Sequence, residues 1–265
     1  MRTNRLKQRL RGDGAVFGCI LQHLRSAEIP RLLAAAGFDF VFIDAEHGGF
    51  GVETIHDAIQ NAVRGGITPL VRVAELTYAL VARTLDLGAE GIILPRVEDP
   101  ARLREAVGWT RFPPEGTRGF GIAPPRLDYE AATLPEVIAH MNSNLVVVVQ
   151  FESRTAIDRC DELLAVPGID VALVGPADLS ISLGVPGEFD HPQVVAAIEK
   201  LAAACRRAGI APGIHCRTAA LAQSWVRRGL RFVSCGTEHS LLLEKAKETV
   251  AALRAAAQQI QGQTP

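Results

Sequence analysis

The sequence contains no long apolar run and no excess of charge of either sign. It has no stretch of about 18 apolar residues that could span a bilayer. Basic and acidic residues nearly balance, so the formal net charge is −1. We therefore expect neither a nucleic-acid surface nor a membrane surface. The basic segment 1–14 lacks the apolar core and cleavage site of a secretory signal.

Cysteine is also scarce, and its spacing argues against a metal or disulfide framework. The scattered residues predict reduced core cysteines of a cytoplasmic protein, with a catalytic cysteine as the alternative. The clustered His and Cys ligands of a zinc site are missing as well. Five cysteines occur, without a CxxC pair: Cys19, Cys160, Cys205, Cys216 and Cys235.

Apolar runs rich in β-branched residues recur along the chain. The chain has 265 residues and is 48% hydrophobic, which is enough for one large core. Continuous apolar runs, as opposed to alternating ones, are typical of parallel strands covered on both faces. The runs span residues 16–21, 40–46, 68–73, 90–97, 145–152, 170–178, 211–216 and 231–236.

Amphipathic helical patterns alternate with these runs, and several end at a glycine. Eight strand–helix units predict an α/β fold in which residues 1–265 form a single (β/α)8 TIM barrel. A doubly wound sheet is the alternative. The helical patterns span residues 27–36, 52–64, 76–88, 100–109, 154–165, 192–208, 217–229 and 239–258, and the glycines are Gly37, Gly88, Gly209 and Gly229.

Two segments favour a homo-oligomer. The connection 111–144 is too long for an ordinary loop, and such an inserted loop is usually functional. It could complete the active-site mouth of a neighbouring subunit. The helix predicted at 239–258 has apolar residues on more than one face, where a half-buried helix shows one stripe. The alternative is that both segments cover only their own barrel.

Ionisable and polar residues collect where the predicted strands end. In a TIM barrel the catalytic groups lie at the carboxyl ends of the strands. These positions therefore converge on one rim, which is stronger support for a site than any single residue. They are Asp44, Glu46, His47, Arg72, Gln150, Glu152, Gly175, Pro176, Ala177 and Asp178.

Glu152 and Asp178 follow two adjacent strands and suggest a cation site. Two carboxylates with open positions for water suit an octahedral divalent ion such as Mg²⁺ or Mn²⁺. The alternative is a pair of rim carboxylates bonded to loop amides. The turn at 175–180 ("GPADLS") could hold an anion on its backbone amides, or could be a plain turn.

Arg72 and His47 complete the candidate chemistry. Arg72 offers a fork suited to a carboxylate, unless its only role is to pair with Asp44 or Asp86. His47 is the histidine with carboxylates beside it on the rim, which favours an acid/base role over the rival His23 and His215.

Lysine is nearly absent, and this excludes one mechanism. A Schiff-base enzyme needs a lysine inside the barrel mouth. All four lysines fall in predicted helices away from the strand ends, so a metal must stabilise any carbanion that forms. They are Lys7, Lys200, Lys245 and Lys247.

Several stretches resemble the HpcH/HpaI class II pyruvate aldolases, of the 4-hydroxy-2-oxoheptanedioate aldolase type, in the phosphoenolpyruvate/pyruvate barrel superfamily. The resemblance covers nearly the whole chain and implies a carbon–carbon lyase. Members cleave 4-hydroxy-2-oxo acids to pyruvate and an aldehyde, and also catalyse the reverse reaction. The matching stretches are "AGFDFVFIDAEHG", "LVRV", "FPPEGTRGFG", "VQFES" and "VPGIDVALVGPADLSISLG".

The resemblance also implies roles for the rim residues. Glu152 and Asp178 are the ligands of Mg²⁺, Mn²⁺ or Co²⁺, which the 2-oxo acid chelates. Arg72 contacts the keto oxygen. His47 and a metal-bound water form the acid/base pair, supported by Asp44 and Asp86. The family assembles as a hexamer, a trimer of dimers. The substrate carboxylate is held by the backbone amides of Gly175, Pro176, Ala177 and Asp178, of which proline can contribute only its position.

The sequence departs from the family pattern where the aldehyde would bind. The first strand lacks a tryptophan that members often carry, and Phe40 replaces another. Ile122 stands where a small polar residue is frequent, and Arg96 where methionine is frequent. Alternatives to the aldolase are a CoA-thioester lyase of the citrate lyase β type and a non-catalytic barrel that binds a 2-oxo acid.

Overall fold

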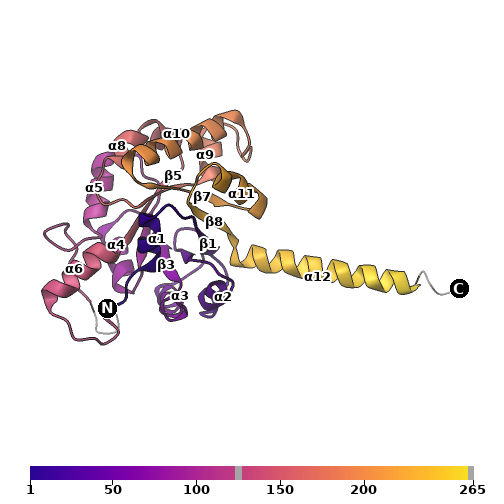
Figure 1. Ribbon diagram of the computed structural model, residues 1–265, viewed down its shortest axis with the longest axis horizontal. Helices are drawn as coiled ribbons and strands as arrows, with labels where there is room; N and C mark the ends of the chain where they lie inside the picture. The colour runs from indigo at the N-terminus through magenta and orange to yellow at the C-terminus, as the bar shows by residue number, and fades with distance from the viewer. Residues whose placement is uncertain (123–126, 262–265) are drawn as a thin grey trace.

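The computed structural model describes residues 1–122 and 127–261. Within them eight parallel strands form a closed barrel in chain order, with β8 pairing with β1 (Figure 1). This confirms the predicted (β/α)8 fold. The strands are β1 (Val16–Leu21), β2 (Phe40–Asp44), β3 (Thr68–Arg72), β4 (Gly91–Leu94), β5 (Val146–Phe151), β6 (Val171–Val174), β7 (Ala211–Cys216) and β8 (Phe232–Thr237).

Helices surround the barrel, apart from α12, which extends away from it (Figure 1). The helices are α1 (Arg5–Arg11), α2 (Ile29–Ala35), α3 (Val52–Gly65), α4 (Tyr78–Asp86), α5 (Pro100–Gly108), α6 (Leu134–Asn144), α7 (Arg154–Asp158), α8 (Cys160–Leu164), α9 (Pro176–Ser182), α10 (Pro192–Ala208), α11 (Ala219–Arg227) and α12 (Glu238–Gln261).

The interior of the barrel is packed with side chains. Strand residues alternate between this interior and the layer under the helices. The Phe40 ring stacks on that of Phe232 with centroids 4.2 Å apart. A Cβ on Gly18 would collide with the Phe40 ring, so only glycine fits there. Leu6 and Leu10 of α1 join the interior cluster, so the barrel interior is a packed core and not a pore.

Part of the predicted loop at 111–144 is helical. Helix α6 begins with a capping box: the Glu136 side chain accepts the backbone amide of Thr133, and the Thr133 side chain accepts the backbone amide of Glu136. This T-x-x-E signal was present in the sequence, but the break in the strand–helix repeat obscured it. The single helix predicted at 154–165 is two short helices, α7 and α8.

Helix α12 contacts the barrel only near its beginning, and then projects from it (Figure 1). Five of its large apolar side chains are exposed: Leu241, Leu242, Leu243, Val250 and Leu253. Helix α12 does not qualify as a membrane span, nor does any other helix in the described part of the chain.

Candidate functional site

A cavity of about 570 Å³ lies at the carboxyl ends of the strands. This volume is within the range of small-molecule sites, and the position is where barrel enzymes place their chemistry. Most of the rim residues predicted from the sequence line it. These are Asp44, His47, Arg72, Gln150, Gly175, Pro176, Ala177 and Asp178.

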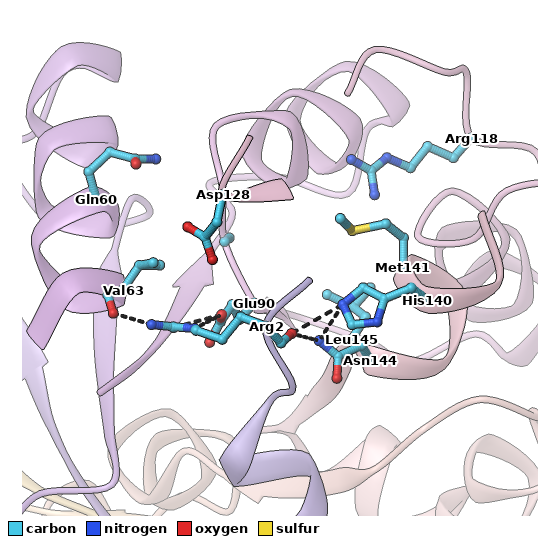
Figure 2. Close-up of a pocket in the computed structure, with 11 residues that line it drawn as sticks. Arg2, Gln60, Val63, Glu90, Arg118, Asp128, His140, Met141, Asn144 and Leu145 are labelled. Carbon is cyan, nitrogen blue, oxygen red and sulfur yellow. Dashed lines mark hydrogen bonds and ion pairs between the residues drawn. The ribbon is translucent and has the colours of Figure 1, made fainter. Parts of the chain in front are cut away.

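A smaller pocket at the amino end of the barrel is structural (Figure 2). Its space is only about 50 Å³, too small for a substrate. Arg2 is bonded to Glu90, with Nη2 at 2.7 Å from Oε1, and its carbonyl oxygen accepts a bond from Asn144 Nδ2 at 2.9 Å. His140 Nε2 lies 3.1 Å from the same oxygen. These contacts fasten the N-terminal segment to the barrel.

A cavity of about 610 Å³ also lies at the amino end, beside α1. Lys7 Nζ donates to both oxygens of Asp170, at 2.7 and 2.8 Å. Arg231 Nη2 donates to the Leu10 carbonyl at 3.1 Å. Side chains there bond to one another and to backbone groups, whereas the predicted rim residues line the carboxyl-end cavity, which is therefore the candidate active site.

A buried ion pair forms the floor of this site. Arg72 Nε and Nη2 donate to Asp44 Oδ1 and Oδ2 at 2.9 and 2.7 Å, so both prongs of the guanidinium bind one carboxylate. Pairing with Asp44 is the alternative role that the sequence left open for Arg72, and its contact with a substrate stays a prediction. The Arg72 Nη1 group remains, 3.4 Å from Gln150 Oε1 and 3.1 Å from Glu46 Oε2.

Asp44 also shapes the loop that follows β2. Its Oδ1 accepts the backbone amides of Glu46 and His47 at 3.0 and 3.2 Å. Burial would raise the pKa of Asp44, but the Arg72 hydrogen bonds and charge, together with these amides, outweigh burial and lower it. A Cβ on Gly48 would collide with the Asp44 carbonyl oxygen, so the tight turn requires glycine. Asp44 therefore supports His47 through the backbone.

His47 projects into the cavity with its side chain 49% exposed. Its Nε2 lies 3.8 Å from Glu46 Oε1. The rival His215 is partly buried, with Nδ1 3.0 Å from Ser234 Oγ. Burial, followed by the charges of Arg72 and Arg217, lowers the pKa of His215 to about 4. At neutral pH His215 is a weak base, which leaves His47 better suited to proton transfer.

Glu152 lies among other carboxylates at the end of β5. Its Oε1 accepts the Arg96 amide at 2.8 Å and its Oε2 accepts Gln150 Nε2 at 2.6 Å. Burial is the main cause of its raised pKa, and the charges of Asp178 and Glu46 add to it although the Arg96 amide opposes them. This negative charge and the all-oxygen donors fit a divalent cation that keeps water ligands.

The turn after β6 brings a second strand end to Glu152. A Cβ on Gly175 would lie 2.9 Å from Gln150 Nε2 and 3.1 Å from Glu152 Oε2, so a larger residue would crowd both side chains. Asp178 is in the first turn of α9, where the amides of Ala177 and Asp178 are not used by the helix itself. Three-residue clusters of His, Cys, Asp or Glu suited to a metal were not found among the described residues. The two carboxylates would therefore act with water or substrate oxygens.

Comparisons with known proteins identify the family. The HpcH/HpaI aldolase/citrate lyase family model matches residues 22–244. The chain belongs to this family.

Two curated relatives of this family member are aldolases. A 2-keto-3-deoxy-L-rhamnonate aldolase of Escherichia coli O17:K52:H18 is 33% identical, over 94% of this chain and 92% of that protein. A 4-hydroxy-2-oxo-heptane-1,7-dioate aldolase of Shigella sonnei is 37% identical, over 86% and 87%. The HpcH/HpaI aldolase structure from Desulfitobacterium hafniense superposes with a TM-score of 0.89 at 31% identity, covering 94% of this chain and 96% of that one. The chain is therefore an aldolase, a carbon–carbon lyase.

Glu46 and Glu152 do not line the cavity but contact its lining residues Arg72 and Gln150, whereas Asp86 lies away from it in its own chain. Asp86 ends α4 shortly before β4 begins, and so lies toward the amino end of the barrel. Its Oδ1 accepts Arg118 Nη2 at 2.6 Å, and Arg118 lies over the Phe112 ring, 4.7 Å from its centroid. Within one chain, Asp86 therefore pairs with Arg118 and does not support His47.

Glu238 was missed from the sequence, and Arg96 was noted there only as a departure from the family pattern. Glu238 is buried, and its carboxylate accepts the amides of Gln22, His23 and Leu24 at 2.6–3.0 Å, which fixes the loop after β1. It directly follows β8, so the strand-end rule applied to that strand would have found it. Arg96 has φ 53° and donates from Nε to Glu46 Oε1 at 2.7 Å. Its positive φ carried no sequence signal.

Proposed function

We propose that this aldolase is a class II enzyme that requires a divalent metal. It cleaves or forms 4-hydroxy-2-oxo acids, using pyruvate or a related 2-oxo acid and an aldehyde. One observation carries the proposal: Asp178, His47 and Arg72 line the cavity, and Glu152 lies beside it, bonded to Gln150 and close enough to feel the charge of Asp178. The four lysines of the barrel lie elsewhere. The names of the two curated relatives support this class of substrate.

Glu152 and Asp178 would hold Mg²⁺, Mn²⁺ or Co²⁺. Hard cations of this kind take carboxylate oxygens and keep several water ligands, so two protein ligands suffice. Neutralising the crowded carboxylates would relieve the repulsion that raises the pKa of Glu152 after burial. When bound, the cation supplies Lewis-acid stabilisation of the negative charge that develops on the 2-oxo acid.

The remaining residues position the substrate and move its proton. In the cleavage direction His47 takes the proton of the C4 hydroxyl while the C3–C4 bond breaks and the aldehyde carbonyl forms. The electron pair of that bond passes to the oxo group as an enolate, and C3 then takes a proton back to give pyruvate. Arg72 Nη1 and Gln150 face the oxo group, and the amides of Ala177 and Asp178 hold the substrate carboxylate. The Asp44–Arg72 pair keeps Arg72 in place, so little reorganisation is needed during the reaction.

The metal requirement is tested by chelation followed by addition of single metals. We expect activity with a simple 4-hydroxy-2-oxo acid to disappear in chelator and to return with Mg²⁺, Mn²⁺ or Co²⁺. Mn²⁺ binding, followed by electron paramagnetic resonance, should weaken in Glu152→Gln and Asp178→Asn, and not in the control Glu162→Gln on α8.

Three results would contradict the proposal. Full activity in chelator would contradict the metal requirement, and borohydride trapping of a substrate adduct would indicate a Schiff base. Turnover of an acyl-CoA in place of the oxo acid would favour the CoA-thioester lyase. Binding of the oxo acid without turnover under any metal would favour the non-catalytic barrel.

We also propose that α12 packs against a second copy of the chain, within a hexamer built as a trimer of dimers. Leu242 and Leu253 are 62% and 66% exposed on a helix that stands clear of its own barrel. Asp86, which pairs with Arg118 away from its own cavity, could then reach a His47 only on another copy. Light scattering should give the mass of an oligomer, and Leu242→Glu with Leu253→Glu should lower it. A monodisperse wild-type monomer at micromolar concentration would contradict the assembly.

A further inference from the structure

The cavity has a second wall that the proposed reaction does not use. The ends of β7, β8 and β1 form it, across the barrel from β4 and β5. Since the cavity holds about 570 Å³, it accommodates more than a three-carbon oxo acid. The residues of this distal wall are His23, His215, Arg217, Thr218, Thr237 and His239.

Arg217 is the cation of the distal wall. It directly follows β7 and lies over the Phe189 ring, 5.8 Å from its centroid, and both residues line the cavity. In the portion of the chain that the structure describes, Arg217 forms no ion pair with a carboxylate. A guanidinium of this kind suits a carboxylate or a phosphate group.

The carboxylates near this wall do not neutralise it. Glu238 is buried, and its two oxygens are occupied by backbone amides of the loop after β1. Glu244, on α12, also lines the cavity; like Arg217 it is exposed, and the two form no ion pair among the described residues. The wall therefore keeps an excess of hydrogen-bond donors.

Imidazole and hydroxyl groups surround Arg217. The rings of His23 and His239 meet edge to face, with centroids 4.6 Å apart. His215 lies near both Arg72 and Arg217, and these charges add to burial in lowering its pKa to about 4. It therefore contributes a neutral ring between the pyruvate end of the cavity and Arg217.

We propose that the distal wall, with Arg217 as its charged contact, binds an anionic group at the far end of the aldehyde. This inference rests on the proposed aldolase function and names its substrate class. The shared chemistry is a carboxylate or a phosphate, and the choice between them is left to the test. Arg217 is then a specificity-determining residue, while Glu152, Asp178, His47 and Arg72 serve any aldehyde alike.

The test compares charged and uncharged aldehydes with pyruvate as donor and Mg²⁺ supplied. Succinic semialdehyde carries a carboxylate, glyceraldehyde 3-phosphate a phosphate, and butanal and glyceraldehyde are their uncharged counterparts. We expect wild type to prefer at least one charged aldehyde in kcat/KM. Arg217→Leu should lower the charged-to-uncharged ratio about ten- to a hundredfold, mostly through KM, because a contact to a charged group is lost. Arg217→Lys should recover part of it.

Arg228→Leu is the matched control, because Arg228 also lies over an aromatic ring, that of Trp225, but outside the cavity. It should leave the ratio unchanged. An equal fall for charged and uncharged aldehydes in Arg217→Leu would indicate a structural role and overturn the inference, as would a wild type without preference. Absence of turnover with every aldehyde would overturn the proposed function as well, whereas turnover with an unchanged ratio overturns this inference alone.

Discussion

The two ends of the barrel use the same kinds of side chain in different ways. At the amino end Lys7, Asn4 and Asp170 bond to each other or to backbone groups around the strand starts. At the carboxyl end Asp44 and Arg72 also pair, but His47 and Asp178 face open space. Polar groups whose hydrogen bonds are satisfied within the protein stabilise the fold. Groups that are held in place but keep unused donors or acceptors can bind a substrate. Mutations at the carboxyl end should therefore affect rate, and those at the amino end stability.

The largest expected effect is that of His47→Ala. A positioned acid/base group contributes about 10²–10⁴-fold, so kcat should fall by that factor. The ring is half exposed, and the backbone amide that Asp44 holds is retained, so stability should change little. The control is His56→Ala on α3, where the ring contacts Asp57. Steady-state kinetics measure the change in kcat. A fall of less than about tenfold would indicate that another group, such as His23, is the acid/base residue.

Arg72→Lys should lower kcat/KM by about 10²–10³-fold. An ammonium cannot bind both Asp44 oxygens and also present a donor to the substrate. The control is Arg111→Lys, another buried arginine, which interacts with the charges of Asp170 and Lys7 at the amino end of the barrel. It should lower stability and leave kcat/KM nearly unchanged. Similar kinetic losses in both variants would remove the distinction between the two ends.

Asp44→Asn should destabilise the fold in a pH-dependent way. Since Arg72 outweighs burial and lowers the Asp44 pKa, the stability from this carboxylate is present above about pH 4, the unfolded pKa. It is lost as the pH falls through the folded pKa. The variant should therefore be less stable by about 3–5 kcal/mol near neutral pH, since it leaves a buried charge unpaired.

Urea unfolding between neutral and acidic pH measures this difference. The gap between wild type and Asp44→Asn should shrink as the pH falls below about 4. The exposed pair of Asp161 and Arg207 gives the control, and Asp161→Asn should change stability by less than about 1 kcal/mol. A gap that stays constant with pH would show that Asp44 acts by packing alone.

The smallest effect is expected from Asn4→Ala at the amino end. Asn4 is fully buried, donates to the Glu90 carbonyl at 2.8 Å and caps α1 by accepting the Lys7 amide at 3.0 Å. Loss of these bonds should cost about 1–3 kcal/mol of unfolding free energy. Activity at a temperature where the variant is folded should stay within about twofold. A larger kinetic loss would mean that the two ends are coupled.

Local pattern was sufficient to predict most of the scaffold. The apolar runs at 40–46 and 145–152 became β2 and β5, because a continuous run is stable only where both faces are covered. The order of strands then brought Asp44, Arg72, Gln150 and Asp178 to one cavity, as the strand-end rule predicts. The sequence alone predicted the types of these four residues and their convergence on one rim, whereas their roles stay proposals.

Partners and directions were decided by the tertiary structure. The sequence shows that Arg72 needs a carboxylate, but only the register of β2 beside β3, with Asp44 opposite Arg72, assigns both of its prongs to Asp44. Asp86 was placed with His47 by resemblance, yet the direction of α4 carries it toward the other end of its own barrel. Residue type and periodicity are local properties, whereas ion pairing depends on which distant segments the closed barrel brings together.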